Sequence, residues 1–423
     1  MGFFDRPATK GNMNGNAGYR DRVRGSLLGG AAGDALGYPV EFLPEITIFS
    51  RYGNGGITQY ELTNGVAQIS DDTQMTLFTA EGILRGTRSR TLSLPQHVHN
   101  AYRDWLITQG IYPADREPTV SRAPGQGVRD LLSVSGLFSP RAPGNTCISA
   151  LRGRGNTLSE DYIHSPFNNS KGCGGIMRMA PVGLLCGPGD AAWMDMEEVD
   201  RLAAQAAAIT HGHSLGYMSA AVAAHVIGRC AADPSRMSLE DIVLEARDTV
   251  KHLFRDDENI DELTRIIDRA MELSVNDRDD LGNIHALGEG WTGEETMGIA
   301  LYCALRYRND FSKAIIAAVN HKGDSDSTGA VTGNIVGALT GYDAIADKWK
   351  KDLELKDLIL EYADALADAV HAETESGSKG GNVSMNARYT FFWKEDEANG
   401  EFSNWYRRVF VIDDLNICSW SSI

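Results

Sequence analysis

Apolar residues recur at three- and four-residue spacing along most of the chain, and this periodicity restricts the fold more than any other feature. The stretches that show it are dominated by Ala, Leu, Met and Glu, which favour helices. They are residues 75–86, 197–209, 214–231, 238–254, 259–273, 295–307, 312–319, 328–340 and 353–371. The alternation typical of strands is scarce, with residues 57–62 as the exception. The sequence therefore predicts an all-α domain with long loops.

The charge balance argues against two classes of partner. The chain of 423 residues carries 40 basic and 57 acidic side chains, which gives a net charge of −17. Such a surface repels nucleic-acid phosphates and anionic membranes, although backbone N–H groups at helix starts can still bind a small anion. No apolar run reaches the roughly 18 residues of a spanning helix, and no signal-peptide core is visible. Because the six cysteines form no C-x-x-C pair, we expect free thiols and a cytoplasmic protein.

Changes in composition divide the chain into four parts. Residues 1–20 are rich in Gly and Asn and predict a flexible N-terminal extension. The helical pattern follows over residues 21–371. Residues 372–388 indicate a polar linker, and residues 389–423 form an aromatic tail that is too short to bury its rings alone.

Two segments in the first half of the domain carry unusual residues. Residues 29–41 are rich in Gly and Ala and end at Glu41. Small residues at this density favour the close approach of another helix or of a ligand, and no strand precedes them, which argues against a dinucleotide site. Residues 70–73 read Ser-Asp-Asp-Thr directly before a helical run. They suit a helix start, but adjacent carboxylates repel each other, and a divalent cation would relieve that repulsion.

A third segment, residues 323–329, reads Gly-Asp-Ser-Asp-Ser-Thr-Gly and leads into a small-residue helix. Its carboxylates and hydroxyls are the hard oxygen ligands that Mg²⁺ and Ca²⁺ prefer. An EF-hand loop is excluded, because Ile335 stands where that loop needs a bidentate Glu. The segment also matches the Asp-x-Asp-x-Thr motif of phosphatases, although its polar lead-in is atypical of them. A solvated turn is the simplest alternative.

A fourth segment, residues 172–178, is rich in glycine and is followed further along by Thr210-His211-Gly212-His213. The glycines could present N–H groups to phosphate or ribose oxygens. His211 and His213 are two residues apart and cannot share one helix face as zinc ligands would. A capping or hydrogen-bonding histidine is the alternative. Residues 143–147 indicate a turn that opens another helix.

In this set and order, the segments resemble the ADP-ribosylglycohydrolase family. The likeness runs over residues 20–371, and its most specific part pairs the Asp-Asp-Thr stretch with the late Asp-x-Asp. It implies a compact orthogonal helical bundle with a dimetal cleft that holds two Mg²⁺ ions, with Mn²⁺ as an alternative. The implied metal ligands are Ser70, Asp71, Asp72, Asp324, Asp326 and Ser327, where Ser327 replaces the usual Thr. The implied ADP-ribose-binding residues are Gly172, Gly174, Gly175, Met177 and His211.

The resemblance implies an ADP-ribosylhydrolase, which cleaves the glycosidic bond between ADP-ribose and a modified protein or small molecule. Positive charge develops on the ribose as this bond breaks, and metal ions would position the sugar and acidify a water. A carboxylate must also move a proton, and Asp72 and Glu41 are the candidates for this catalytic work. An arginine side chain is the favoured acceptor, because residues 70–75 resemble the bacterial branch of the family.

Two other functions stay open at this stage. Some members of the family occlude an ADP-ribosyltransferase toxin, and residues 1–20 could form an arm for such a partner. A metal-dependent phosphohydrolase would use residues 324–328 and would not depend on Asp71 or Asp72. Finally, residues 391–393 and 400–406 resemble the opening of a NADAR domain, from which we expect a truncated remnant without activity.

Overall fold

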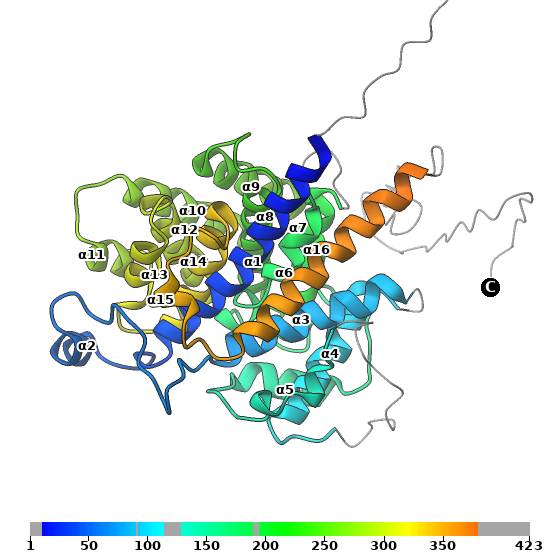
Figure 1. Ribbon diagram of the computed structural model, residues 1–423, viewed down its shortest axis with the longest axis horizontal. Helices are drawn as coiled ribbons and strands as arrows, with labels where there is room; N and C mark the ends of the chain where they lie inside the picture. Colours follow the sequence, from blue (N-terminus) through cyan, green and yellow to red (C-terminus); the bar gives the residue numbers. More distant parts are fainter. Residues whose placement is uncertain (1–10, 90–91, 114–127, 189–193, 380–423) are drawn as a thin grey trace, which may run out of the picture. The chain divides into compact units, whose positions relative to one another are not determined.

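The computed structural model describes residues 11–89, 92–113, 128–188 and 194–379, which form helices joined by loops (Figure 1). The α-helices are α1 (Gly11–Gly37), α2 (Glu45–Tyr52), α3 (Asp71–Arg88), α4 (Leu94–Thr108), α5 (Asn145–Arg154), α6 (Ala180–Gly183), α7 (Met196–Ala208), α8 (Ser214–Ala232), α9 (Leu239–Leu253), α10 (Ile260–Ser274), α11 (Asp280–His285), α12 (Gly293–Arg306), α13 (Phe311–Val319), α14 (Ser325–Thr340), α15 (Asp347–Lys350) and α16 (Lys356–Lys379). Short 3-10 turns are η1 (Leu131–Ser133), η2 (Ser135–Leu137), η3 (Cys173–Gly175) and η4 (Leu184–Cys186).

The predicted all-α fold is confirmed for the part of the chain that the structure describes. This part contains isolated bridges, such as the one between Gly172 and Thr292, but no strand. Residues 57–62, where the sequence alternates, lie in a loop. Each of the nine stretches with helical spacing overlaps a helix of the structure.

α3 and α14 begin earlier than the periodicity predicts, because polar residues cap them. α3 begins at Asp71, and the Ser70 side chain accepts a hydrogen bond from the Asp72 backbone N–H over 3.2 Å. α14 begins at Ser325, and the Asp324 carboxylate accepts from the Ser327 backbone N–H over 3.2 Å. A side-chain acceptor at this position satisfies a backbone donor that has no partner within the helix. The two acidic segments are therefore the first turns of two helices.

Glycines at four-residue intervals hold α1 and α14 together, and the two helices run antiparallel (Figure 1). A Cβ atom on Gly33 would lie 2.0 Å from the carbonyl oxygen of Gly329, and one on Gly333 would lie 2.0 Å from that of Gly29. The backbones touch where no side chain intervenes, so the sequence reading of residues 29–41 as a close-packing segment is confirmed. This contact places the end of α1 beside the start of α14.

The centre of the domain is α8, whose residues are buried along nearly its whole length. Helices α6, α7, α9, α12 and α14 contact it. Its Ala-rich sequence allows neighbouring helices to approach on several sides. Apolar residues occur on all faces of the helix, as expected for a helix that is fully buried. The five cysteines in the described part of the chain are free thiols.

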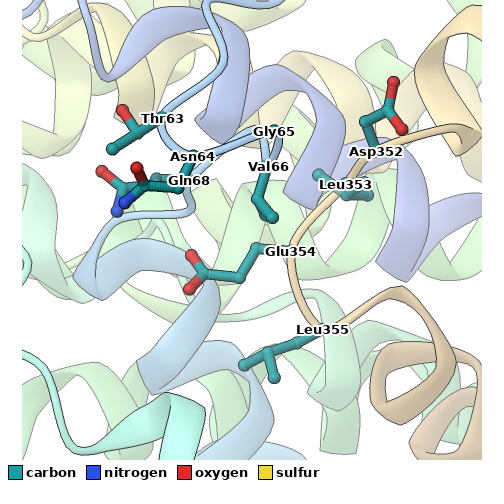
Figure 2. Close-up of a pocket in the computed structure, with 9 residues that line it drawn as sticks. All are labelled: Thr63, Asn64, Gly65, Val66, Gln68, Asp352, Leu353, Glu354 and Leu355. Atoms are coloured by element: carbon teal, nitrogen blue, oxygen red, sulfur yellow. The ribbon is translucent and has the colours of Figure 1, made fainter.

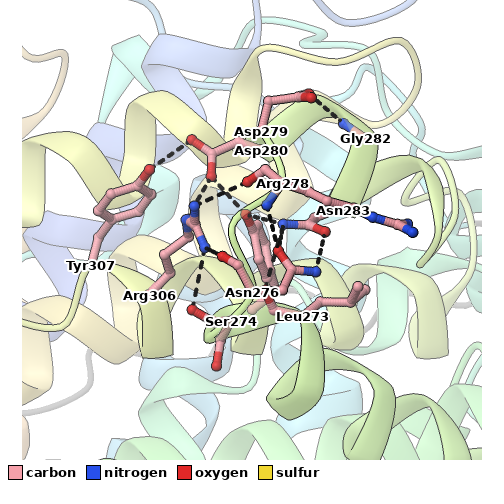
Figure 3. Close-up of polar contacts among 11 residues, drawn as sticks. Leu273, Ser274, Asn276, Arg278, Asp279, Asp280, Gly282, Asn283, Arg306 and Tyr307 are labelled. Carbon is pink, nitrogen blue, oxygen red and sulfur yellow. Dashed lines mark hydrogen bonds and ion pairs between the residues drawn. The ribbon is translucent and has the colours of Figure 1, made fainter.

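A polar network fixes the connection between α10 and α11 (Figure 3). The Arg306 guanidinium donates to the carbonyl oxygens of Asn276 at 2.9 Å and Arg278 at 3.1 Å. It also forms an ion pair with Asp280 at 3.1 Å. The Tyr307 hydroxyl donates to the same Asp280 carboxylate over 2.8 Å. The loop backbone is thus tied to α12.

Two helices extend past the domain boundaries that the sequence predicts. α1 begins at Gly11, inside the expected flexible extension, because Tyr19 is buried and its hydroxyl donates to the carbonyl oxygen of Leu184. α16 continues to Lys379, into the expected linker, and includes Gly377. Residues 1–10, the rest of the linker and the aromatic tail lie outside the described residues.

Among the described helices, none combines the length and apolar character needed to cross a bilayer.

Candidate functional site

The ends of three helices meet around a group of carboxylates. Asp34, near the end of α1, is fully buried, and its carboxylate accepts hydrogen bonds from the backbone N–H groups of Ser70 at 3.0 Å and Thr73 at 3.1 Å. The Thr73 hydroxyl also donates to it. Asp34 therefore fixes the start of α3, and the α1–α14 contact fixes the start of α14 relative to both.

Glu41, Asp324 and Asp326 each offer one carboxylate oxygen to the same point, and these oxygens lie within 4.8 Å of one another. The two aspartates are buried, whereas Glu41 is half-buried. Three carboxylates at this separation form an acidic group with the geometry to hold a metal ion, since hard cations prefer such oxygen ligands.

The electrostatic state of the carboxylates shows that both acidic segments belong to one cluster. Burial, and then the charge of Asp326, raise the pKa values of Asp71 and Asp72 well above the ordinary range. The same two causes raise the pKa of Glu41 to about 11 and that of Asp34 to about 7. The pKa of Asp326 itself is raised by burial. These segments, which are far apart in sequence, therefore lie close enough to repel each other.

Asp71 and Asp72 differ in the hydrogen-bond partners of their carboxylates. The Gly144 backbone N–H donates to Oδ2 of Asp71 over 3.3 Å, so the turn at residues 143–147 belongs to the site wall. Oδ1 of Asp72 is buried and has no hydrogen-bond partner among the described residues. An unpartnered carboxylate oxygen is costly to bury. A divalent cation would compensate for this oxygen and for the mutual repulsion, so the residues fit the predicted metal site.

The glycine-rich turn η3 lies against the start of α14. The Cys173 thiol donates to Oδ2 of Asp324 over 2.7 Å, a contact that spacing in the sequence did not indicate. The Ser327 hydroxyl donates to Sδ of Met177 over 3.9 Å. The predicted ADP-ribose-binding segment and the predicted metal ligands are thus neighbours in the fold.

His211 packs directly on the glycines of this turn. A Cβ on Gly174 would lie 2.9 Å from Cε1 of the His211 ring, and one on Gly172 would lie 3.3 Å from its Nε2. The Nδ1 atom of His211 is 2.9 Å from the Thr210 hydroxyl oxygen. Burial and the nearby Arg178 lower the pKa of His211 to about 3, so its ring is neutral at physiological pH. The turn needs glycine here because the ring occupies the space that a side chain would fill.

Sequence reasoning missed the role of Arg178, which is fully buried. Its guanidinium donates to the Thr210 hydroxyl over 2.6 Å and lies over the Tyr102 ring, 4.3 Å from the centroid. It thereby connects the end of the glycine segment with the Thr210-His211 pair and with α4. A signal was present, since Arg178 is a charged residue in an otherwise apolar and glycine-rich stretch.

A surface pocket is lined by other residues than the clustered carboxylates (Figure 2). Its lining residues are Thr63, Asn64, Gly65, Val66, Gln68, Asp352, Leu353, Glu354 and Leu355. Oε2 of Glu354 accepts from the Ile69 backbone N–H over 3.0 Å, and Oε1 accepts from Arg141 over 2.8 Å. Because Arg141 in turn accepts a hydrogen bond from the Asp71 backbone N–H, this pocket wall supports the start of α3.

The structure therefore brings the sequence-predicted residues into one region. Ser70, Asp71, Asp72, Asp324, Asp326 and Ser327 lie at the first turns of α3 and α14, with Glu41 beside them. Gly172, Gly174, Gly175, Met177 and His211 line the adjoining turn.

Comparison with known proteins is consistent with this arrangement. Residues 15–376 match the sequence model of the family described as ADP-ribosylglycohydrolase. The chain is 25% identical to ADP-ribosyl-[dinitrogen reductase] glycohydrolase of Rhodospirillum rubrum over 354 residues, 79% of this chain and 91% of that protein. It is 27% identical to ADP-ribosylhydrolase ARH3 of Homo sapiens, over 48% of this chain and only 58% of that protein. A solved ADP-ribosylglycohydrolase-related protein complex has the same fold, with a TM-score of 0.56 and 23% identity over 84% of this chain and 99% of that chain.

Proposed function

The chain belongs to the ADP-ribosylglycohydrolase family, and we propose that it releases ADP-ribose from a modified arginine side chain with the help of two Mg²⁺ ions. The observation that carries this proposal is the convergence of the α3 and α14 starts with Glu41 in one buried acidic cluster. A buried cluster of carboxylates without compensating bases is unfavourable unless it binds cations.

In this proposal Ser70, Asp71, Asp72, Asp324, Asp326 and Ser327 hold the cations. Bound Mg²⁺ would position the ribose hydroxyls and favour ionisation of a water at neutral pH. Mn²⁺ would serve as a substitute, because it has a similar preference for carboxylate oxygens. Asp34 and Glu354 do not bind the metal but fix the backbone of residues 69–73.

The bond that breaks joins ribose C1″ to the acceptor nitrogen, and the bond that forms joins C1″ to a water oxygen. The water proton passes to a carboxylate, and the leaving nitrogen receives a proton. We assign this transfer to Glu41, since it is the half-exposed member of the cluster and can reach both the site and solvent. Asp72, which is 3% exposed, is the second candidate.

The adjoining turn is proposed to bind ADP-ribose. The backbone at Gly172, Gly174 and Gly175 carries no side chain that would block a ligand, and Met177 supplies an apolar contact beside Ser327. His211 is neutral, so its ring can exchange hydrogen bonds with a hydroxyl without adding charge. This set lies beside the carboxylates, which suits a ligand whose ribose must reach them.

The direct test is the release of ADP-ribose from arginine-, serine- and DNA-linked substrates, with Mg²⁺ or with a chelator. We expect Mg²⁺-dependent release from the arginine-linked substrate and its loss in Asp326→Ala. Asp195→Ala is the matched control, because Asp195 likewise accepts a backbone hydrogen bond at the start of a helix, α7, from Glu198. Full activity of Asp326→Ala at ordinary Mg²⁺ levels would refute the proposal. Phosphate release from a simple phosphoester, retained after substitution of Asp71, would favour a phosphohydrolase instead.

A further inference from the structure

Two large aromatic side chains are exposed next to the acidic cluster. Phe42 is 65% exposed and Trp291 is 36% exposed. Their rings are stacked, with centroids 5.2 Å apart and an interplanar angle of 26°. Exposed aromatic surface of this kind is unfavourable in water and often marks a binding site. Since Trp291 covers only one face of Phe42, the other face is available to a ligand.

Both residues are attached to the site through their own segments. Phe42 directly follows Glu41, which belongs to the acidic group with Asp324 and Asp326. The Trp291 carbonyl oxygen accepts from the Cys173 backbone N–H over 3.2 Å, and Cys173 contacts Asp324. The aromatic pair therefore borders the cluster from the end of α1 and from the segment before α12. We call these two residues the aromatic wall.

The backbone holds Phe42 in an unusual conformation. Its φ angle is 63°, in the left-handed region that favours glycine and is uncommon for a bulky residue. The flanking hydrogen bonds, from Val40 N–H to the Gly37 carbonyl at 2.9 Å and from Leu43 N–H to the Val40 carbonyl at 3.0 Å, define the turn. Because glycine would fit this turn better, the exposed aromatic ring at this strained position points to a use for the ring.

A carboxylate accompanies the aromatic wall. Glu289 lies two residues before Trp291 and forms an ion pair with Lys322 at 2.7 Å. An aromatic face beside carboxylates is the combination that binds a planar cation, because a guanidinium can stack on the ring and donate to the oxygens at once.

We propose that the aromatic wall of Phe42 and Trp291 recognises the guanidinium of the arginine acceptor and so sets the selectivity for the leaving group. This inference rests on the proposed hydrolase function and assigns it a specificity site outside the metal ligands. The wall lies beside Glu41, where the proton must reach the leaving nitrogen. A hydroxyl-linked acceptor such as serine has no planar cation and gains little from the wall.

Two substitutions test the wall without relying on a damaged fold. Phe42→Gly removes the ring and suits the left-handed backbone, so the variant should melt at or above the wild-type temperature. Trp291→Ala removes the second ring. Trp291→Phe keeps an aromatic ring and should retain much of the selectivity for the arginine-linked substrate. Tyr112→Ala is the control, because Tyr112 is 70% exposed at the end of α4 and lies outside the proposed site.

The readout is kcat/KM for arginine-linked and serine-linked ADP-ribose, together with calorimetric binding of free ADP-ribose. Loss of one partly exposed cation–π contact lowers the arginine-to-serine ratio by roughly fivefold, while ADP-ribose affinity stays within about twofold of wild type. An unchanged ratio in Phe42→Gly and Trp291→Ala overturns the inference. An equal loss of ADP-ribose affinity also overturns it, since the wall would then hold the adenine. Failure of the wild-type protein on every linkage refutes the proposed function itself.

Discussion

The backbone N–H of Ser70 donates to the carboxylate of Asp34 over 3.0 Å, which ties the start of α3 to the end of α1. Asp34 is fully buried and does not belong to the acidic group formed by Glu41, Asp324 and Asp326. Its role is to orient residues 70–73, whose side chains face the cluster. The site therefore depends on a buried carboxylate that contacts the backbone of Ser70 and Thr73 and the hydroxyl of Thr73.

We expect Asp34→Ala to destabilise the protein by about 1–3 kcal/mol, because it leaves the buried N–H groups of Ser70 and Thr73 without an acceptor. Activity should fall further than stability explains, since the first turn of α3 loses its fixed position. Denaturant titration gives the free energy of unfolding, and hydrolysis is measured where the variant is folded. A variant with wild-type stability and activity would contradict this role.

The glycine contact between α1 and α14 should tolerate no added methyl group. Gly333→Ala places Cβ 2.0 Å from the Gly29 carbonyl oxygen, so the helices must separate. We expect a loss of about 2–3 kcal/mol by thermal or chemical unfolding, together with lower activity. Gly55→Ala is the control, because its Cβ would meet nothing closer than 3.7 Å, and it should be nearly neutral.

Stability without metal should fall as the pH rises. The folded protein raises the pKa of Asp34 to about 7 and also raises those of Asp71 and Asp324, whereas unfolded carboxylates titrate near about 4. Between these values the folded state binds more protons than the unfolded state, so each unit of pH removes stability. Melting temperatures in chelator at pH 5 and pH 8 measure this loss.

Added Mg²⁺ should raise the melting temperature more at pH 8 than at pH 5, because the cation competes with protons for the same oxygens. The same comparison in Asp326→Asn should show a smaller effect of Mg²⁺. Equal stabilisation at both pH values would contradict the placement of the cations among these carboxylates.

His211 should contribute to ligand binding as a neutral group. Its pKa is lowered to about 3, so the affinity for ADP-ribose should not change through titration of this ring between pH 5 and pH 8. His211→Ala should weaken ADP-ribose binding by roughly tenfold, the effect of one lost hydrogen bond in a buried site. Calorimetry across this pH range tests both statements. A variant that binds like the wild type would remove His211 from the proposed site.

The helices could be predicted because the apolar spacing that defines them is local. α7, α8, α9 and α10 each begin and end within one residue of the predicted stretch. α3 and α14 begin earlier than predicted, since Ser70 and Asp324 cap them and the first turns are too polar to show apolar periodicity. α1 begins at Gly11, within the expected extension, for a different reason: the buried Tyr19 anchors a Gly-rich segment that composition alone describes as unfolded.

The acidic residues of the site were visible in the sequence, but the contacts that position them were not. Asp34 lies within a glycine-rich stretch whose composition indicates helix packing. No feature of the neighbouring sequence connects it with Ser70. The contact between Cys173 and Asp324 likewise depends on the packing of distant segments. Phe42 and Trp291 stack across an even larger separation in sequence, so single positions in the chain give no indication of the pair.

The most direct test of the account is the stoichiometry of Mn²⁺ binding, measured by calorimetry on wild type, Asp72→Asn and Asp324→Asn. Asparagine at position 324 can still cap α14, Ser70 still caps α3 in Asp72→Asn, and Asp195→Asn serves as the matched control. The account predicts that wild type and control bind two ions per chain and that each of the other variants, one on α3 and one capping α14, loses affinity for at least one of them. Unchanged binding in both Asp72→Asn and Asp324→Asn would show that the two acidic segments do not share a metal site.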